Sequence, residues 1–185
     1  MSPNVRAASS SSTARQLLPG DAALALFPRA AAVIDKRFAN GDICLAVFSK
    51  ETLAGFLWLA FGAYEEDDVR CVYRLPDPQL AWDYDVHIEP AFRMGRSLAR
   101  LWDFANVTLS SRGVGWSLSR ISAFNPESLA AHARLGAQRM QSATFICIGS
   151  LQMALAASWR FPSISLENGA PPDLQVAAPR ASGRQ

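Results

Sequence analysis

The sequence is poor in the residues and runs that build several common kinds of site. It has three cysteines, Cys44, Cys71 and Cys147, at long spacings and without a CxxC pair, which excludes a disulfide framework and the usual zinc motifs. Each lies among apolar neighbours and is expected to be a small buried hydrophobic residue. The two histidines, His87 and His132, have no metal-ligand spacing to the carboxylates. We therefore expect no metal site.

Long apolar runs are absent as well. No stretch reaches the ~18–20 residues that a membrane-spanning helix needs. The N-terminal residues are rich in Ser and Ala and are interrupted by Arg6 and Arg15, so they lack the apolar core of a signal peptide. These absences predict a soluble, cytoplasmic protein with no membrane span.

Strong net charge is also missing. The chain has 18 basic and 16 acidic residues, a formal charge of +2, which argues against a nucleic-acid partner. The charges are unevenly placed, however: residues 42–90 carry three basic and ten acidic groups, and residues 91–160 carry eight basic and two acidic groups. This split suggests two sites of opposite electrostatic preference.

Half of the sequence is apolar, enough for one sizeable core. Residues 1–18 are of low complexity and predict a disordered leader, and the proline-containing residues 167–185 predict a disordered tail. The expected domain is 19–166. Its patterns predict a mixed α/β (α+β) order of helices and strands. The expected helices are 22–38, 93–112 and 126–135. The expected strands are 43–48, 53–64, 69–75, 80–88, 116–124 and 144–148.

The informative stretch begins in the strand 80–88, which alternates so that Asp83, Asp85 and His87 are expected on one face. Pro90 ends this strand, and a turn with Gly95 leads into a helix. Free N–H groups at a helix start attract phosphates, and three arginines, Arg93, Arg96 and Arg100, add positive charge there. Alone, the pattern also fits a capped helix with surface arginines.

A second stretch, 125–137, has Asn125 as the expected N-cap, Pro126 at the first helical position and Gly136 as the expected left-handed C-cap. The strand-Pro-x-x-Arg-turn-helix unit, followed by a strand and then Asn-x-x-Ser and Leu-Gly, resembles the GNAT N-acetyltransferase superfamily. The family motifs are V-x-P-x-x-R-G-x-G-x-G/A and N-x-x-(A/S)-I-x-x-Y-x-K-L-G-F. The resemblance covers about residues 21–150.

The resemblance implies a mostly antiparallel sheet flanked by helices, with a splayed strand pair, and transfer of an acyl group, most simply acetyl, from acyl-CoA to an amine of a small molecule or an amino group. His132 takes the position where many relatives have a tyrosine that protonates the leaving thiolate. Asp83, Asp85, Glu89 or ordered water are the alternatives for the base. The implied coenzyme-binding residues are Val86, His87, Ile88, Arg93, Met94, Gly95, Arg96, Ser97, Asn125 and Ser128.

Two departures from the family pattern stand out. Met94-Gly95-Arg96 replaces a longer loop with two more glycines, and histidine replaces tyrosine at position 132. The shortened loop motivates an alternative, a catalytically inactive GNAT-like binding or assembly module. The apolar segment 145–161 suits a subunit interface, so a homodimer is one expected assembly. Transfer of a longer acyl chain is a third reading.

Overall fold

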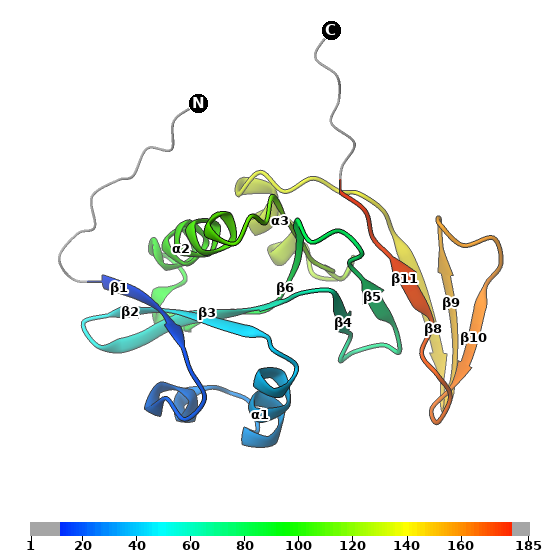
Figure 1. Ribbon diagram of the computed structural model, residues 1–185, viewed down its shortest axis with the longest axis horizontal. Helices are drawn as coiled ribbons and strands as arrows, with labels where there is room; N and C mark the ends of the chain where they lie inside the picture. Colours follow the sequence, from blue (N-terminus) through cyan, green and yellow to red (C-terminus); the bar gives the residue numbers. More distant parts are fainter. Residues whose placement is uncertain (1–11, 179–185) are drawn as a thin grey trace, which may run out of the picture. The chain divides into compact units, whose positions relative to one another are not determined.

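The computed structural model describes residues 12–178, which form two compact units (Figure 1). Within the described residues, unit 1 comprises 12–60 and Asp83–Val114, and unit 2 comprises Phe61–Trp82 and 115–178. The strand β6 (Leu80–Ile88) begins in unit 2 and ends in unit 1. Of the expected leader and tail, 1–11 and 179–185 lie outside the described residues. Residues 12–17, expected in the disordered leader, and Asp173–Gln175, expected in the disordered tail, instead form strands, because each pairs with another strand of the fold.

Unit 1 is built on an antiparallel sheet. Strand β1 (Ser12–Leu17) pairs with β2 (Ile43–Ser49), which pairs with β3 (Thr52–Ala60), and β6 follows β3 in the sheet order. Helix α2 (Ser97–Ser111) packs on β2 and β3 through Leu101, Ala105 and Leu109, which are spaced one helical turn apart and are buried.

The other face of this sheet is covered by the 3-10 helix η1 (Ala22–Leu26) and by α1 (Ala31–Ala39). Phe27 stacks on Phe56 at 3.8 Å between ring centroids, and Phe38 meets the edge of Trp58 at 4.9 Å. Phe56 and Trp58 are fully buried, and each contributes about 1.5–3 kcal/mol or more of transfer free energy. Figure 1 shows α2 and α1 on opposite sides of β2 and β3.

Unit 2 holds two further three-stranded sheets. One has the order β11 (Asp173–Gln175), β5 (Val72–Arg74) and β4 (Ala63–Glu65), and the other has β10 (Ser163–Leu166), β9 (Leu151–Ala156) and β8 (Ala143–Ile148). Strand β7 (Trp116–Leu118) pairs in parallel with the start of β6, and α3 spans Pro126–Arg134. Only the β6–β7 and β5–β11 pairings described are parallel, which confirms the predicted mixed, mostly antiparallel α/β class.

Several predicted boundaries were wrong for identifiable reasons. The single helix expected over 22–38 is broken at Pro28, which has no N–H to donate and disfavours a helical residue before it. The strand expected over 53–64 is divided at Gly62, whose φ of 75° is left-handed. The strand expected over 116–124 ends at Leu118, and the helix expected from Arg93 starts at Ser97 after a 3-10 turn, η2 (Pro90–Phe92).

Strands β9, β10 and β11 were not predicted. The three cysteines were expected to be buried, and this is wrong for Cys147, which is exposed. Within residues 12–178, no helix is both long enough and apolar enough to cross a membrane.

Candidate functional site

The junction between β6 and α2, in unit 1, contains most of the predicted site residues. The Glu89 N–H donates to the Ala54 carbonyl at 3.0 Å, and Pro90 then ends the pairing because it has no N–H. The chain turns through η2, where the Gly95 N–H donates to the Phe92 carbonyl at 3.1 Å. Helix α2 begins directly afterwards, so a strand end and a helix start adjoin through a short turn.

The start of α2 has none of the usual means of satisfying its first N–H groups. Arg96 precedes the helix and forms no side-chain cap, and the first turn contains no acidic residue. The N–H groups of the first turn, Ser97 to Ala99, have no acceptor within a helix. Their partial positive charge attracts an anion and opposes a cation.

Positive side chains nevertheless gather at this helix start. Arg93, Arg96 and Met94 are exposed, and Met94 is fully so. Arg93 Nε donates to the Ile88 carbonyl at 3.1 Å, which ties the turn to the end of β6. Arg100, one turn into the helix, donates to the Ser12 hydroxyl. Cations at a helix N-terminus are unfavourable unless an anion joins them, so the arrangement suits a phosphate.

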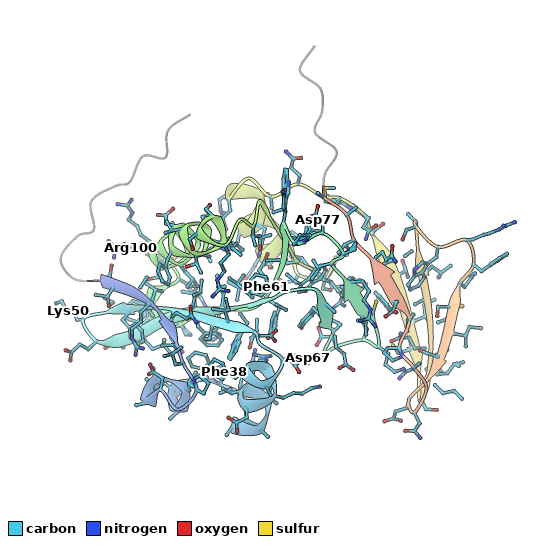
Figure 2. The ribbon with its side chains drawn as sticks, in the orientation of Figure 1. Phe38, Lys50, Phe61, Asp67, Asp77 and Arg100 are labelled. Atoms are coloured by element: carbon cyan, nitrogen blue, oxygen red, sulfur yellow. The ribbon has the colours of Figure 1, made fainter. Side chains whose placement is uncertain are left out.

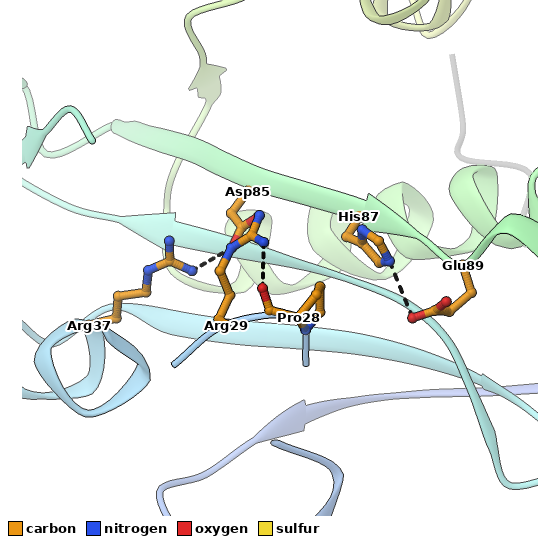
Figure 3. Close-up of polar contacts among 6 residues, drawn as sticks. All are labelled: Pro28, Arg29, Arg37, Asp85, His87 and Glu89. Atoms are coloured by element: carbon orange, nitrogen blue, oxygen red, sulfur yellow. Dashed lines mark hydrogen bonds and ion pairs between the residues drawn. The ribbon is translucent and has the colours of Figure 1, made fainter. Parts of the chain in front are cut away.

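A cluster of ion pairs lies earlier in β6 (Figure 3). The Asp85 carboxylate accepts from Arg37 Nη1 at 2.6 Å and from Arg29 Nε at 2.9 Å, and it also pairs with Arg29 Nη2. Arg37 lies over the rings of Trp58 and Tyr84, at 5.3 and 4.9 Å from their centroids. Two guanidiniums therefore share one carboxylate that is 8% exposed.

The backbone of Asp85 explains how this cluster forms. Its φ is +48°, a left-handed conformation that interrupts the strand's alternation. Tyr84 and Asp85 are neighbours in sequence, and both contact Arg37. The predicted polar row of Asp83, Asp85 and His87 is therefore wrong for Asp83, which alternates with Tyr84 and is 2% exposed.

His87, in β6, and Glu89, directly after the strand, form an accessible polar pair. His87 Nε2 lies 3.2 Å from Glu89 Oε1, and the side chains are 23% and 34% exposed. The imidazole stacks on Phe56 at 5.2 Å between centroids, which fixes the plane of the ring. Figure 3 shows His87 and Asp85 pointing to the same side of the strand. Val86 and Ile88, two predicted coenzyme contacts, are half-buried.

A glycine allows β3 to approach this part of β6. A Cβ at Gly55 would lie 2.6 Å from the His87 carbonyl oxygen and 2.5 Å from Ile88 Cδ1. Those distances are too short for any side chain, so Gly55 is required by the packing of His87 and Ile88.

Burial also affects a carboxyl next to the cluster. Asp42 Oδ2 accepts from the Tyr84 hydroxyl at 2.6 Å. Burial raises the pKa of the Asp42 carboxyl, although the hydrogen bond from Tyr84 and the charge of Arg37 act in the opposite direction.

The remaining predicted site residues lie in unit 2, on α3. Asn125 Oδ1 accepts from the Ser128 N–H at 3.0 Å, and Pro126 is at the start of the helix, which confirms the predicted cap. Gly136 has a φ of 88°, which confirms the left-handed end. His132 Nδ1 lies 2.8 Å from the Ser128 carbonyl, so Nδ1 carries a proton and donates it.

Sequence reasoning missed Arg29, Arg37 and Gly55. The two arginines meet Asp85 across 56 and 48 residues, a separation that gives no local spacing signal. Within the described residues, no group of three His, Cys, Asp or Glu is placed to hold a metal ion.

The fold is shared with solved acetyltransferases. The aminoglycoside acetyltransferase AAC(6')-Iy, in complex with a bisubstrate analogue of CoA, aligns with a TM-score of 0.58 and 16% identity over 75% of this chain and 99% of that chain. An aminoglycoside acetyltransferase from an uncultured soil metagenomic sample, in complex with trehalose, gives 0.53 and 11% over 75% and 97%. A Trypanosoma brucei acetyltransferase gives 0.52 and 15% over 75% and 100%.

These similarities show that the chain has the GNAT fold. No protein-family model matches the sequence, and no curated protein matches it.

Proposed function

We propose that this GNAT-fold chain is an N-acyltransferase that moves an acyl group, most simply acetyl, from acyl-CoA to an amine of a small molecule or an amino group. The observation that carries the proposal is the uncapped, acid-free start of α2 with Arg93 and Arg96 beside it. Without an anionic ligand, cations at a helix N-terminus are electrostatically unfavourable.

In this proposal, the pyrophosphate of the coenzyme binds the N–H groups of Ser97, Leu98 and Ala99 and the guanidiniums of Arg93 and Arg96. Met94 and Gly95 form the exposed turn that leads to them. The N–H of Gly95 already donates within the turn and cannot bind phosphate. The arginines therefore provide the hydrogen-bond donors that backbone N–H groups provide in a longer glycine-rich loop.

The thioester lies along Val86–Ile88, whose backbone N–H groups polarise its carbonyl, as the resemblance implies. The amine nitrogen attacks the thioester carbon directly. The new C–N bond forms, the C–S bond breaks, the amine gives up a proton, and the leaving thiolate takes one. The reaction therefore needs one group that accepts a proton and one that supplies it.

We assign the base to the His87–Glu89 pair. This pair lies at the end of β6 and is accessible, and Glu89 Oε1 is 3.2 Å from His87 Nε2. Asp85 is less suited to the role, because its carboxylate oxygens are already occupied by the guanidiniums of Arg29 and Arg37. We therefore treat Asp85 as a positioning residue that holds the left-handed turn preceding Val86, and Asp83 as a buried support.

We assign the proton donor to His132. Its Nδ1 proton is held by the Ser128 carbonyl, so a neutral ring presents Nε2 only as an acceptor. Donation from Nε2 therefore requires the imidazolium form; with a neutral ring, a water takes the place of His132 as the proton donor. Asn125 and Ser128 support this role by fixing the first turn of α3.

The identity of the acceptor amine is the most specific part of the proposal. Two of the compared enzymes are named for aminoglycosides, and a polyamine acceptor is one candidate here.

An activity assay tests the proposal. Wild-type protein is incubated with acetyl-CoA and a panel of amines, the release of free thiol is followed, and products are identified by mass. Acetylated product with thiol release supports the enzyme. Coenzyme binding without transfer to any amine, including lysine peptides, supports the inactive module instead.

The roles are separated by steady-state kinetics on the active pair of substrates. Glu89→Gln and His132→Ala are expected to lower kcat by ~10²–10⁴-fold and to change the KM for acetyl-CoA little. Equal effects on kcat and KM would remove either residue from proton transfer. Ser111→Ala, at the far end of α2, is the control and should retain wild-type kinetics.

A further inference from the structure

The sheet formed by β8, β9 and β10 has one face that carries apolar side chains but is open to solvent. Residues directly opposite in antiparallel strands project from the same face. The register aligns Ile146 with Met153 and Ile164 in one row, and Ile148 with Leu151 and Leu166 in the next. Six side chains of this outer face are 40–71% exposed, namely Ile146, Ile148, Leu151, Leu155, Ile164 and Leu166.

The opposite, inner face is buried within unit 2 at Gln152, Ala154 and Ser165, and is exposed at Cys147 on the edge strand β8. Gln152 is 1% exposed; its Nε2 donates to the Arg70 carbonyl at 2.6 Å, and its Oε1 accepts from the Arg70 N–H at 2.8 Å. Ser165, opposite Gln152 in the register, is also buried. An antiparallel sheet with one packed face normally has polar side chains on the other. Here the inner face is mixed and includes the buried polar residues Gln152 and Ser165, whereas the outer face is apolar except for Thr144.

We infer that the outer face of β8, β9 and β10 is the interface of a homodimer, covered by the same face of a second copy. The six side chains expose roughly 600 Å², near the upper limit for a monomer's apolar patch. Thr144, opposite Leu155, and Met153, opposite Ile146, extend the same face toward the ~800 Å² that each partner buries in a standard interface.

Charge selects the second copy as the occupant. None of the sixteen residues of β8, β9 and β10 is charged. A two-fold axis brings the same residues of both copies together, which is unfavourable for a charged face and favourable for an uncharged one. Two such faces pack as a β-sandwich with interdigitating Ile and Leu side chains. An anionic lipid surface would favour basic residues among the apolar ones.

The test measures the mass of the full chain in solution by sedimentation equilibrium. We expect wild type at about 100 μM to have twice the chain mass of 20.1 kDa. Ile164→Glu places a charge in the middle row of the face and should convert the protein to one chain mass. Val107→Glu, at an equally exposed apolar residue on α2, is the matched control and should remain dimeric.

A second pair of variants with opposite charges shows whether loss of the dimer comes from the interface or from unfolding. Ile164→Glu and Ile164→Lys, each monomeric alone, should associate when mixed, and both should keep the circular dichroism of wild type. A monomeric wild type, or a dimer that Ile164→Glu leaves intact, would overturn the inference. Binding of wild type, but not of Ile164→Glu, to vesicles of phosphatidylcholine and phosphatidylserine without self-association would also overturn it, in favour of a lipid surface.

Discussion

Arg37 Nη1 and Asp85 Oδ2 lie 2.6 Å apart, and the two side chains are only 7% and 8% exposed. Arg29 completes the cluster from the segment between η1 and α1. The pair therefore links α1 to the one left-handed residue of β6, directly before the strand residues proposed to hold the thioester. The contribution of this cluster to the free energy of unfolding can be measured independently of any activity.

Asp85→Asn is expected to lower the free energy of unfolding by about 3–5 kcal/mol, because two guanidiniums lose their shared buried countercharge. Asparagine tolerates positive φ, so the backbone conformation is retained. Urea denaturation measures the change. The control is Asp173→Asn, whose partner Arg74 is 3.1 Å away in a pair that is about half exposed; it should cost less than about 1 kcal/mol. Equal losses would show that the Asp85 cluster is not a buried ion pair in solution.

Gly55→Ala tests the close approach of β3 to β6. The new methyl group meets the His87 carbonyl and Ile88, so the free energy of unfolding should fall by about 1–3 kcal/mol. In an active preparation, kcat should fall too, since the displaced segment is the proposed thioester site. Gly115→Ala is the control, because its nearest heavy atom is 3.9 Å away, and it should change stability by no more than about 0.5 kcal/mol. A stable Gly55→Ala protein would contradict the packing.

Thiol reactivity distinguishes the three cysteines. Burial raises the pKa of the Cys71 thiol to about 11 and that of Cys44 further, whereas Cys147 is exposed. Because the thiolate is the reactive form, Ellman's reagent at pH 8 should label one thiol per native chain and three after denaturation. Cys147→Ser should abolish the native reaction. Rapid labelling of two or more thiols in the native protein would contradict this burial pattern.

The Asp42 carboxyl predicts a pH dependence. Because its pKa is raised by burial, the native state binds its proton more tightly than the unfolded state does. Its contribution to stability is therefore present at low pH and is lost as the pH rises through the native pKa. Asp42→Asn cannot ionise, and its oxygen can still accept from Tyr84. Calorimetry should find the variant more stable than wild type at pH 7, with the gap closing toward pH ~4. A gap that widens as the pH falls would refute the direction.

Much of the fold could be predicted from local patterns. The strand Leu80–Ile88 was predicted to the residue, because alternation and Pro90 define it. The start and end of α3 were predicted from Asn125, Pro126 and Gly136. The break in the helix at Pro28 could also be expected from the proline itself, but the alanine-rich residues around it favoured the prediction of one continuous helix.

The parts that failed depend on tertiary partners. Ser12–Leu17 follows a run of serines and is mostly polar, and it becomes a strand because β2 offers an edge to pair with. The left-handed φ of Asp85 is held by arginines distant in sequence, so alternation alone placed Asp83 and Asp85 together. For the candidate site, residue types and motif order indicated which segments form it. The roles proposed for Asp85 and for the His87–Glu89 pair could be distinguished only from the side-chain contacts in the structure.

Isothermal titration calorimetry with acetyl-CoA tests the central claim, that the start of α2 holds an anionic coenzyme. Wild type should bind, and Arg96→Ala should weaken binding by about 10–100-fold, the effect of losing charged hydrogen bonds to phosphate. Arg112→Ala, at the opposite end of the same helix, should leave the affinity unchanged within about twofold. No heat of binding with wild type, or equal affinities for the two variants, would contradict the account.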